Sequence, residues 1–242
     1  MVSLAEKMAA NLDMSAFGKA EELKKRLWFT VLALIVFRLG TFIPLPGIDP
    51  KILADIFSRN SNGILGMFNM FAGGALERMT IFALNIMPYI SASIILQLGQ
   101  SVVPSLAALK KEGEAGHRKI VHYTKVLTVL ITIIQGYGIA VGLEGMVGSA
   151  GLSAVVMPGF VFKFTTIVSL VGGTMFIVWL GDQITSRGVG NGSSLIITVG
   201  IIANIPTALA QTFELGRVGS MSLWVILLLM VMVLVLIYVI VL

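Results

Sequence analysis

The sequence predicts an all-α, polytopic membrane protein, and three observations lead to this prediction: its composition, its long apolar runs and the placement of its basic residues. Of the 242 residues, 57% are hydrophobic and only 12% are charged, whereas soluble domains carry about 25% charged residues. Several apolar runs reach the length of about 20 residues that a membrane-spanning helix needs. The net charge of +5 comes from basic residues beside these runs, a pattern that indicates membrane orientation rather than nucleic-acid binding.

The apolar runs predict six spans. They cover residues 24–43, 76–99, 121–141, 157–180, 193–213 and 223–242. The basic triplet KKR before the first run resembles the start of a signal peptide, but "TFIPLPG" follows the run in place of a small-x-small cleavage site. We therefore expect an uncleaved first span. The last run stops at Leu242 without a basic flank, so we expect further chain beyond it.

Basic residues predict the orientation of the spans. If the N-terminus is inside, the inner segments hold Lys7, Lys19, Lys24, Lys25, Arg26, Lys110, Lys111, Arg118, Lys119 and Arg187. The outer segments then hold only Lys51, Arg59, Arg78, Lys163 and Arg217, while Arg38 and Lys125 fall within spans. Because cytoplasmic loops carry the excess of Lys and Arg, we expect residues 100–120 and 181–191 inside. Residues 44–75, 142–156 and 214–222 are then outside.

The segment 61–75, "SNGILGMFNMFAGGA", is too short for a crossing. Its length suits a re-entrant or half-span helix, which survives at membrane depth only where protein or a watery cavity receives it. An outer loop with a surface helix fits the composition equally well. The residues by themselves leave both interpretations open.

The stretch Asn85–Gln100, "NIMPYISASIILQLGQ", places a proline, two serines and glutamine inside an apolar run. Proline removes a backbone donor, and membrane helices tolerate this where neighbours or water satisfy the freed backbone groups. Ile86 and Ile90 stand four residues apart and so share one face of a helix. The pattern indicates a helix that faces something other than lipid.

Catalytic and metal chemistry find little support. The chain has no cysteine, and His117 and His122 are five residues apart in a basic loop, where solvated side chains are expected rather than metal ligands. The motif "RGVGNG" (Arg187–Gly192) lacks the lysine-serine end of a P-loop, and we predict a tight turn that opens a helix at Gly192. Carboxylates lie at or beyond the span ends, so no proton relay is predicted.

Two further features have structural explanations. The pairs Gly136/Ala140 and Gly172/Gly173 are small enough to let helices pack closely. The basic loop "LKKEGEAGHRKI" (Leu109–Ile120) either sets topology alone or also docks a cytoplasmic partner with an acidic surface or RNA. Its charge pattern leaves both possibilities open.

Four stretches together resemble the SecY family, the pore subunits of bacterial protein translocases. They are "ALIVFRLGTFIPLPGID" (Ala33–Asp49), "MFNMFAGGALERMTIFALNIMPYISASIILQL" (Met67–Leu98), "KKEGEAGHRKI" (Lys110–Ile120) and "GDQITSRGVGNGSSLII" (Gly181–Ile197). The resemblance implies ten spans in two inverted five-span halves. This chain would hold a cytoplasmic segment at 1–23, the first half at 24–213 with a plug at about 63–75, and a sixth helix at 214–242.

The resemblance also implies roles for individual residues. The pore ring would be Ile86, Ile90 and Ile197, and the plug would include Ile64, Leu65, Met67, Phe68, Asn69, Met70 and Phe71. Polar candidates at a lateral gate between the second and third spans are Ser91, Ser93, Gln97 and Gln135. The candidate contacts with a cytoplasmic partner are Lys110, Lys111, Arg118, Lys119 and Arg187. One departure is Ser193-Ser194, where the family has isoleucine-serine.

The implied function is a passive channel of the bacterial inner membrane that passes unfolded secretory proteins and releases membrane helices to lipid through the gate. It would be no enzyme and hold no cofactor. Its partners would be SecE, SecG, SecA or the ribosome, signal sequences and nascent chains. A secondary transporter with a broken helix predicts buried charged ligands, which are scarce here, and an intramembrane enzyme needs a polar constellation at membrane depth, which the sequence does not display.

Overall fold

The computed structural model describes residues 21–59, 74–147, 151–206, 210 and 223–241. Within these ranges every regular element is a helix, and β-structure is limited to three isolated bridges. The helices are α3 (Glu21–Gly40), α4 (Pro50–Arg59), α6 (Met87–Val102), α7 (Pro104–Lys111), α8 (Glu114–Glu144), α9 (Phe160–Arg187), α10 (Gly192–Ile202) and α12 (Leu223–Val241). The all-α prediction is confirmed for this part of the chain.

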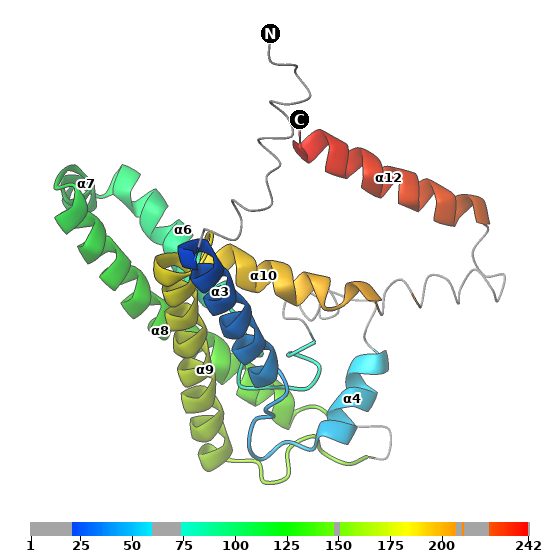
Figure 1. Cartoon of the computed structure of the whole chain (residues 1–242). Helices are drawn as coiled ribbons and strands as arrows, with labels where there is room; N and C mark the ends of the chain where they lie inside the picture. Colours follow the sequence, from blue (N-terminus) through cyan, green and yellow to red (C-terminus); the bar gives the residue numbers. More distant parts are fainter. Residues whose placement is uncertain (1–20, 60–73, 148–150, 207–209, 211–222, 242) are drawn as a thin grey trace.

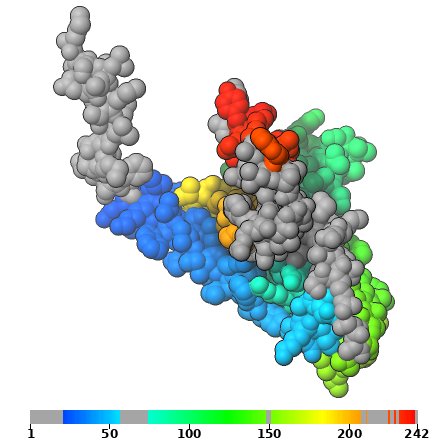
Figure 2. All heavy atoms as spheres, turned by 90° about the vertical axis from the view of Figure 1, so that its right-hand side faces the viewer, coloured from blue at the N-terminus to red at the C-terminus, as the bar shows by residue number. Residues whose placement is uncertain are grey.

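The helices form a bundle around α8 and α9 (Figure 1). α8 packs against α9, α6 and α7, and α9 also packs against α3 and α10. α12 stands apart from this bundle in Figure 1. In the space-filling view, α3 lies on the surface and leads to α4 at its lower end (Figure 2).

Two helices of the described chain, α8 and α9, are long and apolar enough to cross a membrane, and α6 with α7 adds a third if that bent pair counts as one span. The predicted second span, 76–99, is wrong in its first part, because residues 74–86 form turns and the helix begins only at Met87. The positive φ angles of Met79 and Asn85, 45° and 49°, interrupt a helical path there. The expected inner loop 100–120 is mostly helical, since it contains α7 and the first turns of α8.

The bend between α6 and α7 measures 97° and follows from a single proline. Val103 has the extended φ and ψ of −97° and 114°, as expected for a residue that precedes proline. Pro104 then occupies the first turn of α7, where its missing N–H costs nothing. The chain therefore turns sharply and continues as a separate short helix.

A stripe of small side chains runs along α8 at every fourth residue. Thr124, Thr128, Thr132, Gly136 and Ala140 are all buried. Each threonine hydroxyl donates to the carbonyl oxygen four residues earlier, over 2.7–2.8 Å, which satisfies a polar group where lipid or protein offers no water. At Gly136 an added Cβ would lie 3.5 Å from the side chain of Leu170 on α9. The close-packing prediction for Gly136 and Ala140 is confirmed.

The turns before α6 are held between α3 and α9. The N–H of Leu45 donates to Met79 over 2.9 Å, and the N–H of Ile81 donates to Ile43 over 3.1 Å, so non-helical backbone is satisfied by the segment that follows α3. Gly173 of α9 lies against the carbonyl oxygen of Ile81, where any Cβ would overlap it. Its neighbour Gly172 meets nothing within 4 Å. The close-packing prediction therefore holds for Gly173 and not for Gly172.

The loop between α8 and α9 is anchored by one carboxylate. Glu144 accepts a hydrogen bond from the N–H of Gly159 over 2.7 Å and pairs with Lys163 Nζ at 3.0 Å. Gly159 has a φ of 137°, a conformation that favours glycine. These contacts connect the end of α8 to the start of α9.

Candidate functional site

The three predicted pore residues gather in one apolar cluster. Ile86 lies just before α6, Ile90 lies in its first turn, and Ile197 lies on α10. Ile86 is a buried member of one apolar cluster, and Ile90 and Ile197 pack against that same cluster. Ile86 is fully buried, with 0% of its surface exposed, whereas Ile90 and Ile197 are only partly buried. Of the three predicted pore residues, therefore, only Ile90 and Ile197 have side-chain surface that a passing molecule could touch.

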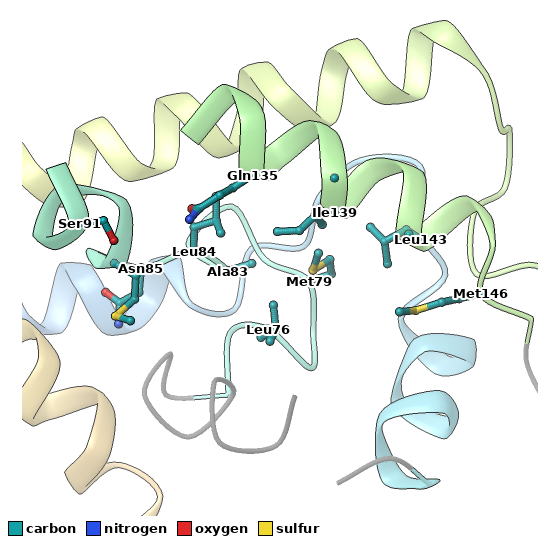
Figure 3. A pocket seen from close by; sticks show the side chains of 13 residues that line it. Leu76, Met79, Ala83, Leu84, Asn85, Ser91, Gln135, Ile139, Leu143 and Met146 are labelled. Atoms are coloured by element: carbon teal, nitrogen blue, oxygen red, sulfur yellow. The ribbon is translucent and has the colours of Figure 1, made fainter. Parts of the chain in front are cut away.

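An apolar cavity of about 640 Å³ lies between the turns before α6, the start of α6 and the second half of α8 (Figure 3). Its lining is mostly apolar, with Asn85, Ser91 and Gln135 as the polar exceptions. Gln135 extends from α8 toward Leu84 (Figure 3). This volume falls within the range of about 300–1,000 Å³ that is typical of ligand sites.

The four predicted gate residues separate into two pairs. Ser91 on α6 and Gln135 on α8 both line the cavity, on its two sides. The side chains of Ser93 and Gln97 form a hydrogen bond of 3.1 Å, from Gln97 Nε2 to Ser93 Oγ. Residues two apart on a helix point in different directions, so Ser91 and Ser93 serve different faces of α6.

The glycine-rich turn after α9 is built for packing and capping. α10 begins at Gly192, as predicted, and Asn191 caps it by accepting the N–H of Ser194 over 3.1 Å. The N–H of Gly192 donates to the Thr185 hydroxyl over 2.9 Å, and an added Cβ at Gly192 would overlap the backbone of Gly181. These contacts show that the motif caps α10 and lets the turn pack closely against α9.

The basic segment has exposed side chains around the bend into α8. Lys110 and Lys111 occupy the last turn of α7, a placement that the helix dipole favours. Two of the other predicted contact residues pair with local acids: Lys119 lies 3.0 Å from Glu112, and Arg118 lies 3.6 Å from Glu114. Arg187, at the end of α9, is also exposed.

One relationship was missed in the sequence. Lys125 Nζ of α8 and Asp182 Oδ2 of α9 form an interhelical ion pair at 2.7 Å. The sequence could have predicted this pair, because it places opposite charges on two consecutive apolar helices. Unpaired charges on such helices cost free energy.

The predicted plug residues Ile64, Leu65, Met67, Phe68, Asn69, Met70 and Phe71 lie outside the described residues. Their role stays a prediction.

The fold and the site define a class: an all-α, multi-pass membrane protein with a broken helix beside a cavity and an apolar cluster. The SecY family profile matches residues 80–242. The protein translocase subunit SecY of Escherichia coli (strain K12) is 56% identical over 214 residues, which cover 88% of this chain and 48% of that protein. The chain belongs to the SecY family.

Solved structures show the same fold. A structure described as that of a protein-conducting channel matches with a TM-score of 0.52 and 18% identity, over 80% of this chain and 38% of that one. Sec61 in the canine ribosome-channel complex from the endoplasmic reticulum matches with the same values. The chain spans about half the length of the curated relatives that it matches.

Proposed function

We propose that this chain forms the first half of the pore-forming subunit of a protein-conducting channel. It would pass unfolded secretory proteins across the bacterial inner membrane and release membrane helices through a lateral gate. The observation that carries the proposal is the 56% identity with a protein translocase subunit over 88% of the chain. The channel itself would be passive, and its partners would supply the energy.

The apolar cluster supports a pore constriction. Ile90 and Ile197 come from different helices, pack against the same buried cluster and keep part of their surface exposed. A ring of apolar side chains excludes water from a narrow passage and so blocks ions. Such side chains make no specific hydrogen bonds, so a polypeptide of any sequence could move past them.

The cavity between α6 and α8 supports a gate at this helix pair. Ser91 and Gln135 offer polar groups in an otherwise apolar lining, and Gly138 and Gly142 keep the α8 side open. If α6 moved away from α8, no hydrogen bond at these four positions would have to break. Segment 61–75 would act as the plug that seals the resting channel.

The exposed basic residues support contact with a cytoplasmic partner, either SecA or the ribosome. Lys110 and Lys111 lie on a short helix that projects at 97° from α6, away from the direction of the span. With the N-terminus cytoplasmic, this helix would face the same compartment as those partners. SecE and SecG would complete the membrane complex.

Reconstitution tests the proposed function. Vesicles that contain the protein with its accompanying subunits should take up a secretory protein when SecA and ATP are present. They should not take up small solutes against a gradient. Solute transport without protein uptake would contradict the proposal and favour a secondary transporter.

A further inference from the structure

The turn that joins α9 to α10 is attached to α3, a helix far away in the chain. The N–H of Val189 donates to the Thr30 hydroxyl over 3.0 Å. The same hydroxyl donates to the carbonyl oxygen of Arg26 over 2.9 Å, and Thr30 is 8% exposed. This one hydroxyl therefore connects the backbone of α3 to the backbone of the turn.

A glycine lets the turn approach α3 this closely. A Cβ added at Gly188 would overlap both the Thr30 hydroxyl and the carbonyl oxygen of Ile184. That carbonyl oxygen already accepts the N–H of Gly188 over 2.8 Å, where α9 ends. The end of α9 and the inner part of α3 are therefore in direct contact through the turn.

The start of α10 has a second attachment, to α9. The N–H of Gly192 donates to the Thr185 hydroxyl over 2.9 Å, and the backbone of Gly192 lies against that of Gly181. A helix held at one point can rotate about that point, whereas a second fixed point at Val189 limits the rotation. The apolar contacts of α10 add stability, but the hydrophobic effect is non-directional and does not fix an angle.

We infer that Thr30 is a positioning residue for Ile197, acting through the turn and α10. Ile197 lies five residues beyond Gly192, or about 7.5 Å along the helix axis at 1.5 Å per residue. When the turn leaves α3, α10 can rotate about Gly192 and carries Ile197 with it. The inference rests on the proposed function, in which Ile197 narrows the passage. Thr30 then determines how tightly the resting channel closes.

Water does not replace this hydroxyl. Thr30→Val keeps the shape of the side chain and removes the acceptor. The Val189 N–H can then bind water, because Val189 is 40% exposed, but a water molecule does not hold the turn to α3. Thr30→Ser keeps the hydroxyl and should behave as the wild type.

The distance between α3 and α10 tests the positioning directly. Spin labels at Leu32→Cys and Thr198→Cys report it in the protein purified with the subunits that accompany it, since both positions are exposed and the chain has no cysteine of its own. Thr30→Val should widen the distribution of distances, and Thr30→Ser should restore it. Gly188→Ala, which pushes the turn away from α3, should widen it as well. An unchanged distribution in both Thr30→Val and Gly188→Ala overturns the inference.

Ion leak from vesicles tests the consequence for the passage. Thr30→Val should raise the resting leak about fivefold, the change in an equilibrium that loss of one ordinary hydrogen bond makes. Thr165→Val is the matched control and should stay tight, because the Thr165 hydroxyl donates only within α9, to Val161 and Phe162. A widened distribution without a leak supports the positioning by Thr30 and counts against Ile197 as the constriction. The two failures are thereby told apart.

Discussion

Lys125 Nζ of α8 and Asp182 Oδ2 of α9 lie 2.7 Å apart and join two helices that are each long enough to cross a membrane. Their side chains are 35% and 42% exposed, so neither charge is fully withdrawn from its surroundings. The small-residue stripe of α8 brings the two helices close, and the ion pair fixes their register near one end.

Removal of one partner should destabilise the bundle. Asp182→Asn leaves the Lys125 ammonium without its carboxylate, and we expect a loss of about 1 kcal/mol, because the pair is partly exposed. The exchange Lys125→Asp/Asp182→Lys should recover part of this loss, because the pair is restored in reverse. Thermal unfolding of the single and double variants measures the coupling. Strictly additive effects would show that the two residues do not stabilise each other.

The apolar constriction should control the resting ion leak. Ile90→Ser/Ile197→Ser places hydroxyls on two half-buried positions that pack against the same apolar cluster, so water and ions should enter the closed channel more easily. Ion flux from vesicles loaded with a fluorescent indicator measures this. Ile237→Ser, on α12 and 54% exposed, is the control and should stay tight. A double variant as tight as the control would mean that these residues are not the constriction.

Ile86 should behave differently from its two neighbours. Its side chain has no exposed surface and packs among Phe82, Ile177 and Ile196. Ile86→Ala should therefore cost about 2–4 kcal/mol of stability through the cavity that it leaves. Denaturation of the purified protein measures this loss. Normal stability combined with a strong ion leak would instead place Ile86 at the passage.

The carboxylate of Glu144 should hold the loop between α8 and α9. Glu144→Ala removes both the acceptor for the Gly159 N–H and the ion pair with Lys163, so the loop should become more sensitive to protease. Glu144→Gln keeps an acceptor oxygen and should retain most of the protection. Limited proteolysis of the two variants compares them. Equal cleavage in Gln and Ala variants would show that the charge, rather than the hydrogen bond, is what matters.

Neutralisation of Lys110 and Lys111 should weaken binding of SecA or the ribosome modestly. Both side chains are exposed, and contacts between exposed charges are screened beyond a Debye length of about 8 Å at physiological salt. The difference between wild type and Lys110→Gln/Lys111→Gln should therefore shrink as salt rises. Affinity measured across salt concentrations, after membrane insertion is verified, checks this. Identical affinities at every salt concentration would leave the segment with a topological role alone.

Cysteine labelling should establish the topology. Gly116 is a poor labelling position, because an added Cβ would overlap the carbonyl oxygen of Leu109. Ala115 and Leu152 are exposed, so cysteines there can react without strain. Ala115→Cys should label from the cytoplasmic side and Leu152→Cys from the opposite side. Labelling of both from one side would refute the predicted orientation.

The sequence by itself determined the class of the protein, its family and most of its helices. Apolar runs far longer than a soluble strand or helix requires leave few alternatives to a membrane helix. The turn after α9 was readable because the glycine-rich motif Arg187–Gly192 predicts a tight turn that opens a helix. Gly136 and Ala140, two members of the small stripe of α8, were likewise visible from their spacing of four residues. These signals are local, so they need no knowledge of neighbouring segments.

Only the tertiary structure decided how those segments meet. Residues 76–86 are apolar enough for a helix, yet they form turns. Gly173 leaves room for the backbone of Ile81, Gly40 leaves room for the Phe82 ring, and Ile43 and Leu45 satisfy backbone hydrogen bonds of the segment. The burial of Ile86, the pairing of Lys125 with Asp182 and the separation of Ser91 from Ser93 depend on helices that are distant in sequence. Hydropathy measures how favourably a side chain is transferred out of water, and this transfer free energy does not specify which residues it will contact.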